Sequence, residues 1–519
     1  SDRKIAGENE GNRAELQVSK SREATAMGVL RVQIREADKA KLTPARVHLR
    51  DAQGKFYYPK GCVPYERDGH FTVDGQFTIS LPPGKVSILI EKGKEYRSIS
   101  DEILMQSGED HHVECEIHRW IDMAERGWYS GDLHIHRRLN DMAHLILAED
   151  LNVAPDITVW NQWNEWTEKE IPAERVVEVD RTHAYGILTQ EDERRGGAVL
   201  LMNLNSPVDL GKASDWYPAN FAYCQAAHER GSIVDQEKPF WWEAPVNVAL
   251  GGVDTIGILN NHIQREDIMD NEAWGRRRDT DRYPGDRGFV ENVLDLYYKY
   301  LNMGLRLPIS AGSASGVLKN PVGYNRLYVH LGHRFSYDRW FRGMKAGLAF
   351  ATNGPMLFFS VDRCELGTTL NVPGGQEFCG KASLNVISQN VLDRAEILYN
   401  GEIIHEFSGG GSSELTKEFD ISLKESGWIA ARAFEKNESG TKNPVIRFAH
   451  TNPIYISSFL ENPRVRGDQS KKDSRGLCPL EIGSLMKPRR DAAQYYLDWC
   501  KELLSASSAD EKRYATDEQ

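Results

Sequence analysis

Residues 131–160, GDLHIHRRLNDMAHLILAEDLNVAPDITVW, carry the pattern that decides the fold expected for the centre of the chain. LHIH has the polar–apolar alternation of a strand, NDMAHLILAEDL is helix-like, and ITVW is a second strand-like run. Similar runs recur as far as residue 331, namely AYGILT, AVLLMNL, GSIV, DTIGIL, LPIS and LYVHL. The helix-like segments FAYCQAAHERG and VENVLDLYYKYLNMG lie between some of them. Because strands that alternate with helices build parallel sheets, the sequence predicts an α/β sheet or barrel over residues 119–355.

The segments on either side have the short alternating runs of β-sandwiches. VLRVQI, ARVHLR and KVSILIE predict an N-terminal, carboxypeptidase-regulatory-like β-sandwich over residues 27–118. LFFSVD, ASLNVIS and GWIAARAF predict a C-terminal β-sandwich over 356–457. Residues 1–26 are polar and unpatterned, which indicates a flexible lead-in. The tail, 458–519, contains a predicted C-terminal helix, DAAQYYLDWCKELLSA.

Composition excludes several classes of function. The net charge of −12 argues against a nucleic-acid-binding surface. No run of about 18 apolar residues is present, so no membrane span is expected. The seven cysteines never form C-x-x-C, which excludes zinc ribbons and thioredoxin-like sites. The accessory sandwiches and the start at Ser1 favour export to the periplasm or the medium, and a homo-oligomer is compatible with this composition.

The histidine pair of the opening stretch is half of a metal site. Side chains two residues apart on a strand point to the same face, so His134 and His136 aim two imidazoles at one place, which suits a transition metal. Polar groups also follow two later strand-like runs, in TQEDERRGG (189–197) and ILNNH (258–262). In a barrel these strand ends converge, so we expect polar side chains near the pair from among Glu191, Asp192, Glu193, Asn260, Asn261 and His262.

These residues resemble a known family. WYSGDLHIH (128–136), followed by Asp141, resembles motif one of the PHP (polymerase and histidinol phosphatase) metal-dependent hydrolases, and GLRLPISAGSASG and GLAFATNGPMLFFSVD resemble their carbaryl-hydrolase-like, CehA/McbA branch. The resemblance covers about 127–362. It implies a PHP-like distorted (βα)7 barrel between the two β-sandwiches, with metals at the strand C-termini. It also implies that His134, His136, Asp141 and Glu191 are metal ligands.

The chain departs from the family pattern at three places. TVWN replaces T-D-H-N and puts Trp160 at a histidine position; Lys238-Pro239 replaces His-Pro; and GSASG replaces G-S-D-x-H, so that Ala314 and Gly316 stand where ligands are usual. The remaining ligands cannot hold a trinuclear cluster. We therefore expect one divalent metal ion, Zn, Mn or Fe, on His134, His136 and Glu191, completed by His262 or water.

The leading functional hypothesis is a metal-dependent hydrolase that activates water against an ester, carbamate, amide or phosphoester bond. Asp192 or Glu193 is the expected general base, and Lys238 or Arg194 the expected electrophilic partner; the alternative role of Lys238 is an ion pair with Glu237 or Glu243. The expected substrate is a small molecule or a carbohydrate. Candidate residues for binding it are Trp160, Asn161, Trp241, Trp242, Asn261, Arg276, Tyr324 and Arg326.

Two other hypotheses remain open at this point. Six tryptophans on loops and an Arg-rich stretch at 271–288 are also typical of a carbohydrate-active enzyme that cleaves glycosides between two carboxyl groups. A protein that lost its metals would instead be a non-catalytic, PHP-like binding protein. Metal content separates this last hypothesis from the first.

Overall fold

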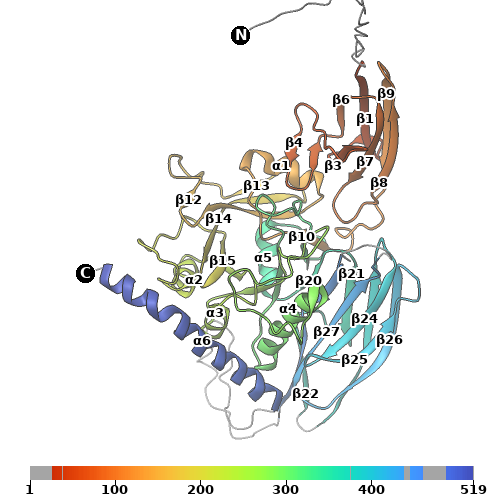
Figure 1. Ribbon diagram of the computed structural model, residues 1–519. Helices are drawn as coiled ribbons and strands as arrows, with labels where there is room; N and C mark the ends of the chain where they lie inside the picture. Colours follow the sequence, from red (N-terminus) through yellow and green to blue (C-terminus); the bar gives the residue numbers. More distant parts are fainter. Residues whose placement is uncertain (1–25, 38, 374–375, 438–444, 460–486, 518–519) are drawn as a thin grey trace, which may run out of the picture.

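The computed structural model describes residues 26–37, 39–373, 376–437, 445–459 and 487–517, and arranges them as an N-terminal sandwich, a central unit and a C-terminal set of strands (Figure 1). The predicted flexible lead-in lies outside the described residues except for Ala26, and so does the part of the tail from 460 to 486.

The N-terminal sandwich consists of two sheets that face each other. One has the order β2 (Lys41–Leu42), β1 (Gly28–Glu36), β6 (Gln76–Leu81), with β9 (Asp110–Ile117) parallel to β1. The other has the order β4 (Val63–Tyr65), β5 (His70–Val73), β3 (Ala45–Asp51), β7 (Gly84–Glu91), β8 (Ile99–Met105). Every second residue of β1 is buried, Leu30, Val32 and Ile34 among them, as expected for strands with one face on a core.

The central unit mixes strands with a few helices. Its elements are β10 (Trp128–Gly131), α1 (Leu139–Ala148), β11 (Val153–Trp160), β12 (Trp163–Asn164), β13 (Val176–Glu178), β14 (Ala184–Arg194), β15 (Gly197–Met202), α2 (Asn220–Glu229), β16 (Ile233–Gln236), α3 (Ala244–Ala249), β17 (Thr255–Leu259), α4 (Gly285–Asn302), β18 (Ile309–Ala311), β19 (Arg326–His330), α5 (Tyr337–Lys345) and β20 (Ala349–Thr352). Strands β11 and β14 run parallel, as do β16, β17 and β18, whereas β14, β15 and β16 are antiparallel neighbours.

The predicted (βα)7 barrel is wrong. The protein is mostly β, with 41% strand and 17% helix, and over the described residues its several sheets do not close into a barrel. The physical reason is that several strands are connected to, or paired with, antiparallel neighbours. AYGILT and AVLLMNL were expected as strands of a repeating strand–helix pattern, but they form the hairpin β14–β15, which turns at residues 195 and 196. LYVHL lies in β19, which is antiparallel to both β10 and β20. A tight turn joins the antiparallel strands β14 and β15, so no helix is needed between these two.

The C-terminal strands form a second layered unit. One sheet has the order β21 (Met356–Val361), β23 (Phe378–Ile387), β26 (Glu414–Leu423). Opposite it lie β22 (Thr369–Pro373), β24 (Leu392–Tyr399), β25 (Glu402–Ser408), β27 (Gly427–Glu435), β28 (Phe448–Thr451) and β29 (Ile454–Phe459). Because β28 pairs with β20, these strands continue the central sheet.

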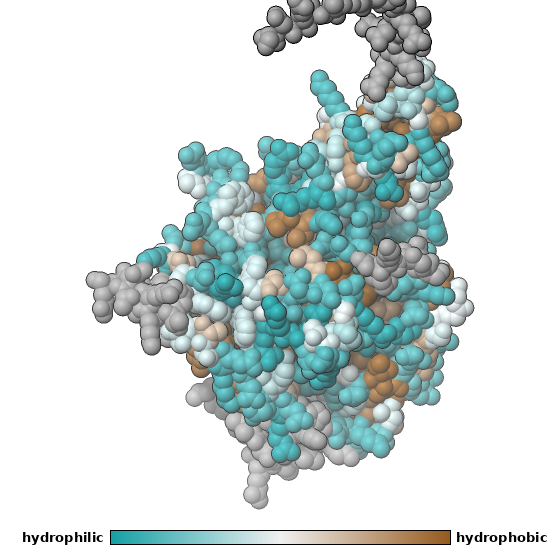
Figure 2. All heavy atoms as spheres, in the orientation of Figure 1, coloured by the Kyte–Doolittle hydropathy of each residue, from teal (hydrophilic) through white to brown (hydrophobic). Residues whose placement is uncertain are grey.

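The last helix, α6 (Lys487–Asp517), crosses the central unit beside α3 and α4 (Figure 1). The rings of Tyr300 and Tyr496 stack with their centroids 4.2 Å apart, and the Tyr496 hydroxyl donates to the Leu296 carbonyl at 2.6 Å. The face of the molecule in Figure 2 is mostly hydrophilic. Within the described residues, every helix is too short or too polar to cross a membrane.

Candidate metal centre

The segment that carries the histidine pair lies beyond the end of β10, between β11 and the residues that follow β18. The backbone amide of Leu133 donates to the Ala311 carbonyl at 3.1 Å, and that of His136 donates to the Ser315 carbonyl at 2.7 Å. On the other side, the Ile157 amide donates to the Ile135 carbonyl at 2.8 Å. These bonds keep the segment extended, so His134 and His136 share one face.

Asp132 anchors this segment from inside the protein. Its carboxylate accepts hydrogen bonds from the backbone amides of His134 at 3.1 Å, Ser313 at 3.0 Å and Gly323 at 2.8 Å. Its side chain is fully buried, and burial raises the pKa of the carboxyl to about 6. Asp132 therefore ties three chain segments together, and the sequence pattern did not assign it this role.

The GSASG stretch packs directly against the histidines. A Cβ atom on Gly312 would lie 2.6 Å from the His134 Cβ, and one on Gly316 would lie 1.9 Å from the His136 carbonyl oxygen. Gly316 also has a φ of +109°, which residues with a side chain rarely adopt. Glycine at these positions is thus a packing requirement, and the stretch contributes no side-chain ligand from Ala314 or Gly316.

His134, His136 and Glu191 bring three donor atoms to one place. The two Nε2 atoms are 3.0 Å apart, His136 Nε2 is 3.1 Å from Glu191 Oε2, and His134 Nε2 is 3.5 Å from Glu191 Oε1. Ligands about 2.0–2.2 Å from a tetrahedral ion lie about 3.3–3.6 Å apart, and the spacing is shorter in an octahedral site. The three side chains are almost fully buried. Their number, chemistry and spacing therefore fit one divalent cation.

The charges of this group are strongly coupled. Burial disfavours a charge on His134, but Glu191 and Glu237 outweigh it and raise the pKa of the imidazole to about 10. The contacts of Glu191 with His134, and to a lesser degree with His136, hold the pKa of Glu191 below its usual range despite burial. Burial lowers the pKa of His136. In the absence of a cation a proton on His134 balances Glu191, and a cation would displace that proton.

Glu237 holds the far side of the His134 ring. Its Oε1 lies 3.2 Å from His134 Nδ1, and its Oε2 accepts a hydrogen bond of 2.8 Å from Trp241 Nε1. Lys238 donates to the same carboxylate and lies 4.7 Å from the centre of the Trp241 ring. Of the two ion-pair partners considered for Lys238, the structure has Glu237. A carboxylate on the second ring nitrogen fixes the tautomer and orientation of a ligating histidine.

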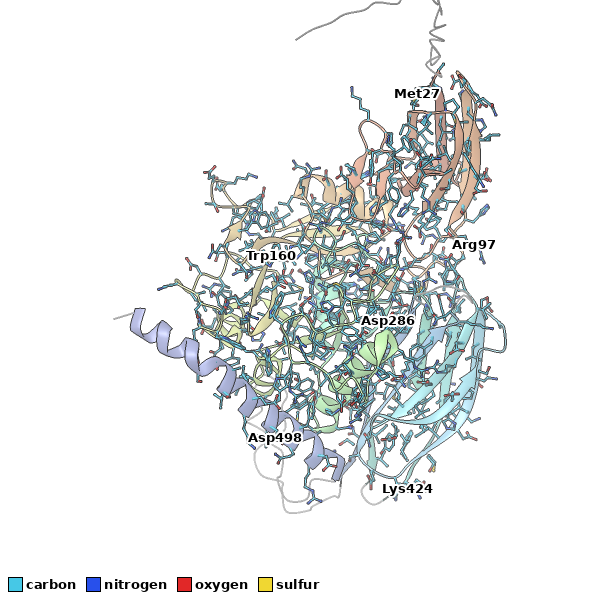
Figure 3. All side chains as sticks on the ribbon, in the orientation of Figure 1. Met27, Arg97, Trp160, Asp286, Lys424 and Asp498 are labelled. Carbon is cyan, nitrogen blue, oxygen red and sulfur yellow. The ribbon has the colours of Figure 1, made fainter. Side chains whose placement is uncertain are left out.

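The two faces of β14 separate the candidate acids. Glu193 lies on the face of Glu191, and its carboxylate accepts a hydrogen bond from Trp160 Nε1 at 2.9 Å, while the Trp160 ring lies 4.8 Å from that of His136. Burial and the neighbouring Glu191 raise the pKa of Glu193 to about 7. Asp192 points the other way and forms a two-point ion pair with Arg194, both distances being 2.8 Å. Glu193 therefore belongs to the centre, whereas Asp192 and Arg194 do not. Trp160, the hydrogen-bond partner of Glu193, is labelled in Figure 3.

Asp141 and His262 lie outside the group of three donors. Asp141 forms an ion pair of 3.0 Å with Arg138 at the start of α1. The ring of His262 stacks on that of Phe289 at 5.7 Å, and its Nδ1 is 2.8 Å from the Asn271 carbonyl oxygen. Burial and the nearby Lys238 lower the pKa of His262 to about 3, so the imidazole is neutral.

Besides Trp160, two of the residues expected to bind substrate lie beside the centre. Asn161 accepts a hydrogen bond from the Glu193 amide at 2.8 Å, and Asn261 lines a small cavity next to His134. Trp241 is fully buried. The indole of Trp242 donates a hydrogen bond of 3.0 Å to the Trp274 carbonyl. Of these two tryptophans, Trp241 contacts Lys238, whose ammonium lies 4.7 Å from its ring centre.

The other three lie elsewhere. Arg276 forms an ion pair of 2.9 Å with Glu502 of α6. The ring of Tyr324 packs against the ammonium of Lys94, which lies 3.9 Å from its centre. Arg326 is fully buried and donates to backbone carbonyls, that of Asp150 at 3.1 Å among them. The structure therefore does not bring these side chains to the histidine pair.

A second cluster that the sequence pattern did not suggest lies in the N-terminal sandwich. Asp68 Oδ2 is 2.7 Å from His70 Nδ1 and 3.6 Å from His48 Nε2. However, Arg46 Nη1 lies 3.5 Å from the same His48 nitrogen, and Arg265 lies 3.4 Å from Asp68. The guanidinium groups already supply the positive charge, so this cluster is a buried ionic contact between the sandwich and the central unit.

The sequence was also compared with known proteins. No protein-family model matches it, and no curated protein gives a significant match. The resemblance to PHP-type hydrolases therefore rests on the motif residues themselves.

Proposed function

We propose that this protein is a metal-dependent hydrolase with one divalent cation on His134, His136 and Glu191. The observation that carries the proposal is the spacing of 3.0–3.5 Å between the ring nitrogens and carboxylate oxygens of three buried side chains, with Glu237 on the second nitrogen of His134. Two imidazoles and one carboxylate leave part of the coordination sphere for water or substrate, which is the form that catalytic sites take.

A divalent cation at this place supplies Lewis acidity, which makes water a stronger nucleophile and polarises a carbonyl or phosphoryl oxygen. The side chains around it have separate tasks. Glu237 orients His134, and Lys238 neutralises Glu237. Glu193 shares the face of Glu191 and accepts the proton that leaves the attacking water. Esters, carbamates and phosphoesters are the substrate classes that this chemistry serves.

The orienting role of Glu237 gives one prediction. We expect Glu237→Gln to weaken zinc or manganese binding about 10- to 100-fold, because the neutral amide holds the imidazole less firmly. Competition with a chromophoric chelator measures the dissociation constant. Glu243→Gln is the control, since Glu243 is buried nearby but accepts its hydrogen bond from the Asn220 amide. Equal affinities in the two variants would remove Glu237 from the centre.

The hydrolase itself is tested by turnover of p-nitrophenyl esters, aryl carbamates and p-nitrophenyl phosphate, with and without chelator. On the substrate that is cleaved, we expect Glu193→Gln to lower kcat about 10²- to 10⁴-fold while metal content stays unchanged. Asp192→Asn is the comparison, because Asp192 faces Arg194 and Asn220 instead of the histidines. It is expected to lower stability and to retain kcat. Turnover that is insensitive to chelator, or the opposite ranking of the two variants, contradicts the proposed mechanism.

A further inference from the structure

A polar cavity of about 260 Å³ lies where the N-terminal sandwich, the central unit and the C-terminal strands meet. Lys94 enters it from the segment after β7, Tyr324 from the central unit, and Arg447 from the residue just before β28. Figure 3 labels Arg97, three residues beyond Lys94, at the junction of the sandwich with the C-terminal strands. The cavity is smaller than those that hold drug-sized ligands.

Lys94 forms no direct ion pair with the described carboxylates that line this cavity. Its ammonium donates to the Asn353 carbonyl at 2.9 Å and lies 3.9 Å from the centre of the Tyr324 ring. Among the described residues, no carboxylate forms an ion pair with it. Burial, with Arg326 and Arg447 nearby, holds the pKa of Lys94 well below its usual range. A charged amine in such surroundings is costly unless an anion joins it.

The acids that line the cavity are already committed to other groups. Glu149 and Glu91 form ion pairs with Arg46 at 2.8 and 3.1 Å. Glu435 accepts a hydrogen bond of 2.8 Å from the Asn390 side chain and lies 3.7 Å from Arg447. None of these carboxylates is within ion-pair distance of Lys94 over the part of the chain that is described.

Lys94 and Tyr324 also keep unused hydrogen-bonding capacity. An ammonium has three donors, of which the Asn353 carbonyl takes one. The buried Tyr324 hydroxyl lies beside the Arg447 guanidinium, which can only donate to it, and it has no acceptor for its own proton among the described residues. Buried polar groups are normally paired, so a hydroxyl proton left unpaired beside a cation without a direct ion pair indicates a missing acceptor.

We propose that this cavity binds a small oxyanion, a carboxylate or a phosphate, which accepts hydrogen bonds from Lys94 and Tyr324. The arginines that line the cavity suit such a group, because guanidinium and ammonium donors are the usual partners of carboxylate and phosphate oxygens. Because its walls come from all three units, a bound anion stabilises their arrangement and is linked to folding by mass action. This site is separate from the histidine pair.

The test is calorimetric titration of the full chain with sodium malonate and with inorganic phosphate, against sodium chloride at equal ionic strength. We expect saturable binding of one of the two anions, at one site per chain, with a matching rise in Tm; the anion that binds identifies the chemistry. The affinity is expected to fall at least about tenfold in Lys94→Met, as for loss of a charged hydrogen bond. Lys85→Met, which removes an exposed lysine of the same sandwich paired with Glu102, is the control and is expected to bind normally.

Tyr324→Phe removes only the hydroxyl and keeps the inference testable if Lys94→Met does not fold. It is expected to weaken binding several-fold. Titrations are repeated after chelator treatment, so that an anion that binds at the histidine pair is distinguished by its loss. The inference is overturned if neither anion binds more tightly than chloride, or if Lys94→Met and Tyr324→Phe both bind as well as the wild type.

Discussion

Replacing His134 and His136 together with alanine is expected to reduce bound metal from about one equivalent per chain to none. The reason is that these imidazoles supply two of the three donors that lie within 4.8 Å of one another, and Glu191 alone is a weak site. Elemental analysis of protein purified without chelator, and again after exposure to zinc, manganese and iron, measures the change. Hydrolysis of any identified substrate is expected to fall to background with the metal.

The matched control is His144→Ala. His144 lies on α1 and is bound to Asp74 and Thr72 at 2.7 and 2.8 Å, so it tests the loss of a histidine outside the centre. The double variant leaves the Glu191 carboxylate buried without its partners, and breaking a buried ion pair in this way costs about 3–5 kcal/mol. Near-UV circular dichroism therefore accompanies the metal assay, and adding Glu191→Gln removes the unpaired charge.

Two results would contradict the metal centre. One is a folded wild-type protein that takes up none of the three metals. The other is a double variant that keeps its metal, because the ligands would then lie elsewhere in the chain. A folded, metal-free double variant beside a loaded His144→Ala is the expected pair of results.

The sequence predicted most of the strands but not how they are joined. ITVW, AYGILT, AVLLMNL and DTIGIL coincide with β11, β14, β15 and β17. A fully buried apolar run has the same pattern whether its neighbouring strand is parallel or antiparallel. Periodicity therefore does not give the relative direction of two strands. A signal for the β14–β15 hairpin was Gly196-Gly197 between two such runs, since glycines between strand-like runs mark turns; Gly196 stands in the turn and Gly197 begins β15. Gly197 has a φ of +131°.

The ligands that are close together in the sequence could be predicted, but the residues that come from distant parts of the sequence could not. His134 and His136 are two residues apart, so strand geometry alone places them together. Glu237 joins them only because β16 lies beside β15 and, through it, near β14. Choosing Glu193 over Asp192 required knowing which face of β14 is turned toward the histidines, because Asp192 is buried on the opposite face. Arg276 is occupied by Glu502, from a helix more than two hundred residues later, which no local pattern reveals.

Arg326 gives the prediction with the largest expected effect on stability. We expect Arg326→Met to lower the free energy of unfolding of the central unit by roughly 3–6 kcal/mol, since each buried polar group left unpaired costs about 1–3 kcal/mol. The side chain has no exposed surface and donates to the carbonyls of Gly323, Asp150 and Glu149. It thus joins the loop before β19 to the end of α1.

Arg339→Met is the matched control, because Arg339 also donates to two carbonyls, those of Arg334 and Leu331, but is only half-buried at the start of α5. Water replaces its hydrogen bonds when it is removed, so a loss of under about 1 kcal/mol is expected. Urea unfolding followed by tryptophan fluorescence compares the two. If Arg326→Met is instead as stable as the control and loses substrate affinity, then Arg326 contacts substrate as the sequence pattern suggested. The buried carbonyl contacts favour the structural role, because a guanidinium held by three backbone oxygens has few donors left for a ligand.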